Sequence, residues 1–192
     1  MEIKYEREVS IEFYKKAPFI HWYKVEGFHD NLSQFKEEIT TGFHEEKKER
    51  WGKGLWNVSL SKGGAFEYST NIFYYIINNY YFVTKPFFNS NIQVYIQDNK
   101  EGRSIPHSHE TTSTITATTY LDPPEEGEGG ELELSYNEQK MRIQPKKDII
   151  YFFPSWLTHR PLPQTREKPR VCLNWGYDCE IRPIHKLTGD RW

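Results

Sequence analysis

The sequence has little cysteine, no long apolar run and no excess of basic residues. Its 192 residues include only two cysteines, Cys172 and Cys179. Two are too few for a disulfide scaffold or a cysteine-only zinc site, so we expect reduced thiols in a cytoplasmic protein. The longest apolar stretch, residues 72–83, is broken by Asn78 and Asn79. It is shorter than the roughly 20 residues of a membrane helix, which argues against a membrane protein.

The charge balance points away from nucleic acid as a partner. The chain has 25 basic and 27 acidic side chains, which gives a net charge of -2. A protein that coats nucleic acid would show a strong basic excess. The first 13 residues are charged and lack the apolar segment of a secretory signal, which fits the cytoplasmic expectation.

The length and the strand pattern predict one domain over residues 1–192. We expect residues 1–90 to provide helical and β support, with a helix over 28–49 and a second segment over 70–83 whose length favours helix. Residues 91–180 should form the core and 181–192 a tail. The core contains short runs rich in β-branched and aromatic residues between turn clusters, which predicts a mainly β (α+β) antiparallel sandwich or barrel. The runs are NIQVYIQ, STITATTYL, ELELSY, KMRIQ, DIIYFF and RVCLNWGY.

Three features in this β-rich half could together form a metal site. His107 and His109 flank Ser108 just before one predicted strand, His159 follows another, and Arg170 opens a third. Histidines at i and i+2 of a strand project from one face, and a third from a distant strand could complete a three-ligand site for iron(II). Arg170 could bind a carboxylate through two parallel hydrogen bonds. A 2-oxo acid needs both features: a metal for its keto-carboxylate end and an anchor for its far carboxylate.

The third ligand has an alternative on the sequence alone. Glu110 follows His109 directly and could bind the metal in its place. Adjacent residues of a strand point to opposite faces, so His109 is the better candidate. The acidic segment Glu125–Glu131 is more simply a solvated hairpin loop than a site.

The motifs of residues 92–180 resemble the 2-oxoglutarate/iron(II) oxygenase superfamily. The resemblance is strongest to its prolyl-4-hydroxylase-like branch and to small oxygenases of bacteria and phages with an HxH motif. Six motifs occur in the family's order. They are His107-Ser108-His109, Thr119-Tyr120-Leu121, Gly129-Gly130-Glu131-Leu132, Pro145-Lys146-Lys147-Asp148, Phe153-Pro154-Ser155-Trp156 leading to His159, and Arg170-Val171-Cys172-Leu173-Asn174-Trp175.

This resemblance implies a double-stranded β-helix, also called a jelly roll, and the cofactors Fe(II), 2-oxoglutarate and O2. His107, His109 and His159 would bind the metal, and Arg170 would pair with the distal carboxylate of 2-oxoglutarate. The cosubstrate pocket would also include Tyr120, Asn174 or Trp175, and Tyr95. The implied reaction hydroxylates a C–H bond and converts 2-oxoglutarate to succinate and carbon dioxide. The chain would act in the cytoplasm, or in the host cytoplasm if a phage encodes it.

Two departures from the family pattern keep other functions open. His109 stands where Asp or Glu is usual, which leaves the iron one charge more positive. Asp148 replaces a common turn glycine, a position where Asp tolerates unusual dihedral angles. The alternatives are a cupin-like three-histidine dioxygenase without 2-oxoglutarate, which Arg170 argues against, and a non-catalytic binding barrel. The primary substrate could be a protein side chain or a small metabolite, and no motif in the sequence indicates which.

Overall fold

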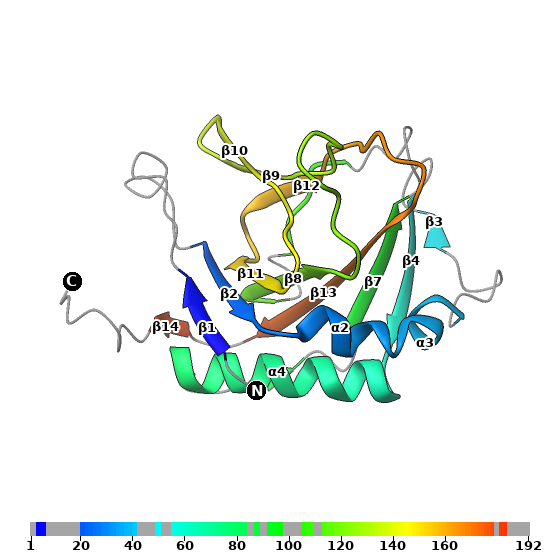
Figure 1. Ribbon diagram of the computed structural model, residues 1–192. Helices are drawn as coiled ribbons and strands as arrows, with labels where there is room; N and C mark the ends of the chain where they lie inside the picture. The colour runs from blue at the N-terminus through cyan, green and yellow to red at the C-terminus, as the bar shows by residue number, and fades with distance from the viewer. Residues whose placement is uncertain are drawn as a thin grey trace.

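Two antiparallel β-sheets face each other, and helices cover the outer face of the larger sheet (Figure 1). A computed structural model of the protein describes residues 3–6, 20–41, 49–50, 55–83, 87–88, 92–97, 105–109, 113–178 and 181–183. Within these residues the secondary structure is mostly strand, as the sequence predicts.

The larger sheet has nine strands in the order β1-β2-β11-β8-β13-β7-β4-β3, and β6 also pairs with β13. Apart from the pairs β1-β2 and β4-β3, neighbours in this order are far apart in the sequence, which is typical of a jelly-roll arrangement. The strands are β1 (Ile3–Glu6), β2 (His21–Val25), β3 (Glu49–Arg50), β4 (Leu55–Leu60), β6 (Phe87–Phe88), β7 (Ile92–Gln97), β8 (Ile115–Tyr120), β11 (Ile149–Pro154) and β13 (Arg170–Asp178).

The smaller sheet lies across from the first and has the order β10-β9-β12. Its strands are β9 (Leu132–Tyr136), β10 (Gln139–Ile143) and β12 (Thr158–Pro161), and a separate pair joins β5 (Tyr81–Val83) to β14 (Ile181–Pro183). The segment Glu125–Glu131 connects β8 to β9, which belong to different sheets. The hairpin that we predicted there is therefore wrong, although Glu125 and Glu126 are exposed as expected.

Helices α2 (Phe28–Ser33), α3 (Lys36–Thr41) and α4 (Gly64–Tyr80) pack against the larger sheet (Figure 1). Helix α4 confirms the helical reading of residues 70–80, and the chain then continues as β5. The single helix predicted over 28–49 is wrong, because Gln34 N and Phe35 N donate i→i−3 hydrogen bonds to Asn31 O and Leu32 O, which divide α2 from α3. Residues 42–48 of the predicted helix lie outside the described residues. None of the described helices is long and apolar enough to cross a membrane.

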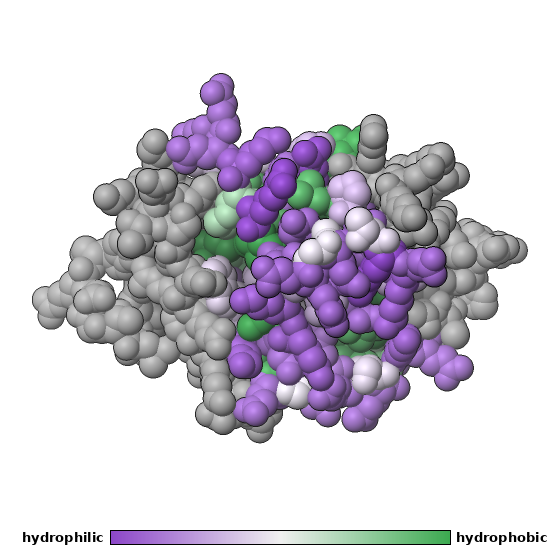
Figure 2. Space-filling view, turned by 45° about the horizontal axis from the view of Figure 1, so that its top comes forward, coloured by the Kyte–Doolittle hydropathy of each residue, from purple (hydrophilic) through white to green (hydrophobic). Residues whose placement is uncertain are grey.

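Alternation along the strands gives the larger sheet two distinct faces. On β13, Leu173 and Trp175 join the hydrophobic core between the sheet and the helices, where Phe73 of α4 also lies. Arg170, which alternation places on the opposite side, faces the space between the two sheets. Most of the described surface in Figure 2 is hydrophilic, with apolar residues visible mainly in recesses. The space between the sheets holds the buried Arg170 and also a second hydrophobic cluster, to which Leu132, Leu134 and Phe153 contribute.

Candidate metal and cosubstrate site

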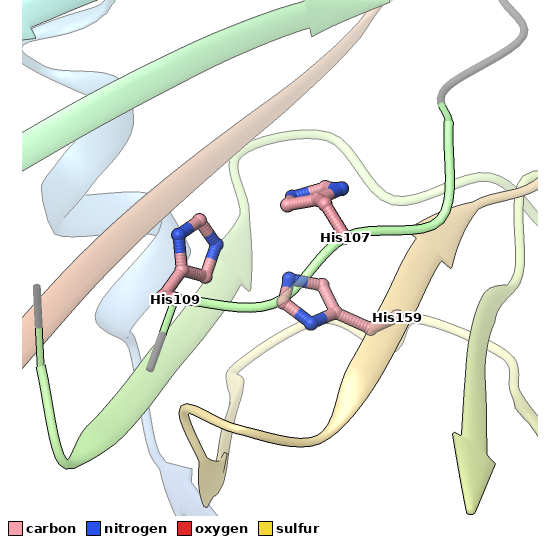
Figure 3. Close-up of side chains that lie close together, drawn as sticks. All are labelled: His107, His109 and His159. Carbon is pink, nitrogen blue, oxygen red and sulfur yellow. The ribbon is translucent and has the colours of Figure 1, made fainter. Parts of the chain in front are cut away.

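Three histidines from two distant segments point toward one another (Figure 3). His107 and His109 precede β8, and His159 lies on β12. The His107 and His159 ring centroids are 4.5 Å apart, and His109 lies 5.0 Å from each of the other rings. One ring nitrogen from each residue lies within 4.8 Å of the other two. The structure thus brings together the three ligands predicted from the sequence, in an arrangement that one metal ion could bridge.

Backbone hydrogen bonds fix the two histidine segments against each other. His107 and His159 form an isolated antiparallel bridge, and His109 N donates to Ser155 O over 2.7 Å. Residues 105–109 are otherwise not a strand, so the expectation of an i, i+2 strand pair is wrong. His159 lies on a strand of its own, β12, which the sequence pattern did not predict because it contains no apolar alternation.

Two of the rings have a defined tautomer. His107 Nδ1 donates to Ile105 O, and His159 Nδ1 donates to Leu157 O, each over 2.9 Å. A carbonyl oxygen can only accept, so these Nδ1 atoms carry the proton and Nε2 presents its lone pair. A backbone carbonyl behind a metal-binding histidine is a common way to orient the ring and raise its basicity.

Burial keeps two of the three histidines, His109 and His159, neutral. Burial lowers the pKa of His159 to about 3, and His107 adds to this effect. Burial likewise lowers the pKa of His109 to about 4, again with a contribution from His107. Neutral imidazole is the form that binds a metal, so these two side chains need lose no proton at neutral pH.

A buried cluster of three hydroxyl groups lies behind the His109 segment. Ser155 Oγ is 2.8 Å from Ser113 Oγ and 2.9 Å from Thr116 Oγ1, and all three side chains are buried. Ser113 N also donates to His109 O over 3.0 Å. The cluster joins the end of β11 to the start of β8, which holds the ligand-bearing segment in place.

Arg170 is a buried cation in the same space between the sheets. Its side chain is 1% exposed, and its Nη1 and Nη2 donate to Gly130 O and Gln97 Oε1. Its Nε is buried without a hydrogen-bond partner, and none of the ion pairs among the described residues involves the guanidinium. Burial lowers its pKa, but a guanidinium stays charged in proteins. A buried charge without a counter-ion is costly, so this group suits a carboxylate ligand.

Tyr120 stands beside Arg170. The guanidinium carbon lies 5.4 Å from the centre of the Tyr120 ring, and Tyr120 is 1% exposed. Burial raises the pKa of the Tyr120 phenol, which keeps its hydroxyl protonated as a hydrogen-bond donor.

His29 Nε2 donates to Tyr120 O, and Asp148 N donates to His29 Nδ1 over 2.5 Å. Asp148 has φ 63°, the unusual turn conformation that we expected there.

The remaining residues predicted for the pocket lie on two different faces of the larger sheet. Asn174 and Tyr95 alternate with core residues and share the Arg170 face of the sheet. Trp175 does not: its ring packs 3.7 Å from that of Phe73 in the core under the helices. The assignment of Trp175 to the pocket is therefore corrected, because odd and even positions of β13 point to opposite sides.

Sequence reasoning missed the two groups that hold the Arg170 guanidinium. Gln97 pairs with Arg170 across the β7–β13 ladder, and the Gly130 backbone approaches from the smaller sheet. The sequence held one indication of the side on which Gln97 lies. It ends a predicted strand in which Ile92, Val94 and Ile96 are apolar, so alternation places Gln97 on the opposite face from them. The partnership itself depends on strand register, which the sequence does not give.

The space between the sheets links the metal-binding candidates to the cation. The Phe153 ring lies 4.9 Å from His159, and Phe153 alternates with Phe152, which lies in the core under the helices. His159 pairs with Leu134, which clusters with Phe153, so the His159 ring lies on the side of β12 that faces the space between the sheets, as Arg170 does on β13. A metal bound to one side of a small acid and a cation bound to its other end is an arrangement that this space can provide.

Comparison with known proteins agrees with this geometry. The profile of the family described as "2OG-Fe(II) oxygenase superfamily" matches residues 83–176, which include all three histidines and Arg170. No curated protein matches the chain by sequence.

Solved structures of low sequence identity share the fold. A prolyl hydroxylase from Trichoplax adhaerens, in complex with a peptide of the hypoxia inducible factor oxygen degradation domain, superposes with a TM-score of 0.64 at 16% identity, covering 83% of each chain. A viral collagen prolyl hydroxylase from Paramecium Bursaria Chlorella virus-1 gives 0.56 at 16% identity, over 81% of this chain and 94% of that one. A carbocyclase of nogalamycin biosynthesis, described as non-heme and alpha ketoglutarate dependent, gives 0.61 at 13% identity, over 93% and 87%. The double-stranded β-helix prediction is thereby confirmed.

Proposed function

Because the chain belongs to the 2OG-Fe(II) oxygenase superfamily, we propose that His107, His109 and His159 hold its iron and that Arg170 binds the distal carboxylate of 2-oxoglutarate. The enzyme is a 2-oxoglutarate-dependent hydroxylase. When bound, iron and 2-oxoglutarate supply the oxidation: O2 gives one oxygen atom to a C–H bond and one to succinate, with loss of carbon dioxide.

The burial of Arg170 is the observation that carries this assignment. Its guanidinium is 1% exposed and is held by two neutral acceptors, Gly130 O and Gln97 Oε1. A structural arginine in such a place would be expected to have a carboxylate partner. The protonated hydroxyl of Tyr120 would donate to the same ligand carboxylate, and Asn174 and Tyr95 would line the remaining pocket.

For the primary substrate we propose a side chain of a peptide or protein. Two of the large apolar side chains that are exposed in the described structure flank the histidines: Ile105 is 74% exposed and Trp156 is 40% exposed. The carbonyl of Ile105 accepts a hydrogen bond from the His107 ring, and the Trp156 ring lies tilted beside that of Tyr136 with ring centroids 5.5 Å apart. The peptide bound by the Trichoplax enzyme supports this substrate class.

The experiment incubates the iron-loaded enzyme with 2-oxoglutarate, O2 and a diverse peptide library, and follows succinate together with peptide mass. We expect peptide-dependent succinate and a product heavier by one oxygen atom, with neither product in R170A. Trp156→Ala should reduce peptide oxidation, whereas Tyr75→Ala, an exposed aromatic on α4, should not. Succinate formed with no oxidised peptide, but with an oxidised small metabolite, would contradict the peptide assignment and leave the oxygenase assignment intact.

A further inference from the structure

Gln97 is a buried neighbour of the Arg170 guanidinium in the proposed cosubstrate site. It is the last residue of β7, its side chain is 1% exposed, and its Cα pairs with that of Arg170 on β13. Its amide oxygen accepts a hydrogen bond from Arg170 Nη2. A glutamate at this position would form a buried ion pair, so the neutral amide has a distinct electrostatic consequence.

The guanidinium is held on both terminal nitrogens by uncharged acceptors. Gly130 O accepts from Nη1 and Gln97 Oε1 accepts from Nη2, while Nε has no partner. Uncharged acceptors restrict the orientation of the group without cancelling its charge. The full positive charge and the Nε–H donor therefore remain for an incoming carboxylate.

Gln97 also contacts the loop that precedes Arg170. Its Nε2 lies 3.5 Å from Leu162 O, and Gln164 Nε2 lies 3.5 Å from Gln97 O. Gln164 is itself buried and donates to Lys168 O over 2.7 Å. The amide of Gln97 thus lies between Arg170 and the 162–168 loop, and its orientation is set from both sides.

We infer that Gln97 is a positioning residue for 2-oxoglutarate, an uncharged acceptor that orients Arg170 while leaving its charge available to the cosubstrate carboxylate. This inference rests on the proposed function of Arg170. Gln97 acts through the guanidinium and not on the metal, so changes at Gln97 should alter cosubstrate affinity and leave metal affinity unchanged.

The substitution Gln97→Glu separates positioning from structural support. Glutamate has the same shape and can keep both its contact to Arg170 and its place in the strand. Its charge would pair with Arg170 and occupy the cation, so the dissociation constant of 2-oxoglutarate should rise by about 100-fold or more. Because the new ion pair replaces a neutral contact, the melting temperature of the protein without 2-oxoglutarate should not fall.

The measurement is an anaerobic titration of the full chain, first with iron(II) and then with 2-oxoglutarate, on the native protein, Q97E, Q97L and Q93E. Gln93 is the matched control, because it lies on the same strand and the same face but contacts Ser59 (2.9 Å) and not Arg170. Q93E should bind both ligands as the native protein does. Q97L removes the acceptor without adding charge, so its 2-oxoglutarate affinity should fall about tenfold.

Each outcome decides the inference. Weak 2-oxoglutarate binding by Q97E at native iron affinity and native melting temperature supports it, and Q97L gives the same decision if Q97E does not fold. Native 2-oxoglutarate affinity in Q97E and Q97L, with loss of binding in R170A, overturns the role of Gln97 but keeps that of Arg170. Absence of 2-oxoglutarate binding by the native protein overturns both the inference and the proposed function.

Discussion

His107 and His159 are joined by two backbone hydrogen bonds that run in opposite directions. His107 N donates to His159 O over 3.0 Å, and His159 N donates to His107 O over 2.9 Å. These bonds bring together two side chains that are 52 positions apart in the sequence. The backbone thus holds the two side chains next to each other.

Removal of single histidines should reveal which residues bind the metal. We expect His107→Ala, His109→Ala and His159→Ala each to weaken iron(II) affinity by at least about 10- to 100-fold, the loss that even outer-shell changes cause. Glu110→Gln should leave the affinity unchanged. Anaerobic titration with iron(II) measures this, and a larger loss in E110Q than in H109A would make Glu110 the third ligand.

Gly130 should be sensitive to a single added methyl group. A Cβ at Gly130 would lie 2.6 Å from Pro124 Cγ and 3.4 Å from Gln164 Cβ, and φ is +75°. Gly127 is a matched control, with φ +91° and nothing within 4 Å of its Cβ position. Gly127→Ala should cost about 1 kcal/mol of unfolding free energy for the left-handed backbone alone. Gly130→Ala should cost about 1–3 kcal/mol more for the clash, and should weaken 2-oxoglutarate binding. Equal losses of stability in urea unfolding would contradict the close approach at Gly130.

The buried His29 should make stability depend on pH. Burial lowers its pKa below 6.5, although the nearby Asp148 carboxylate opposes this effect. Between the folded-state pKa and about pH 6.5, the unfolded chain therefore binds more protons at His29 than the folded protein does. The contribution of His29 is fully present above that pH and is lost as the pH falls toward the folded pKa.

Urea unfolding of the native protein and His29→Gln between pH 7.5 and 5 tests this relationship. With the same metal loading in both, the native unfolding free energy should fall more steeply, by up to about 1.4 kcal/mol per pH unit. The constant difference between the two proteins reports the lost hydrogen bonds, and only the difference in slope reports titration. Parallel pH profiles would show that His29 does not titrate between these states.

The sequence predicted the parts of the fold that local patterns encode. The strands with β-branched and aromatic residues are present, the three histidines lie close together, and Arg170 is buried. Each has a local signal: a strand pattern, an HxH spacing, or a basic residue opening an apolar strand. Each of these patterns is weak evidence alone, and their occurrence in the order of the family's motifs is what pointed to one site.

Features that depend on register and on contacts between distant segments could not be predicted. Strand β12, with the sequence THRP, has no apolar alternation and exists because β9 pairs with it. The face of Trp175 depends on the parity of β13, and one position decides between pocket and core. The contact of Gln97 with Arg170 likewise follows from the pairing of β7 with β13.

The most direct test of the central claim is an anaerobic titration of metal-free protein with iron(II) and then 2-oxoglutarate, with R170A alongside. The native protein should develop a visible metal-to-ligand charge-transfer band when 2-oxoglutarate is added. In R170A the band should appear only at about 100-fold higher 2-oxoglutarate, while iron affinity stays native. Tight iron binding with no band in the native protein would contradict the claim and favour a cupin-like dioxygenase or a non-catalytic barrel.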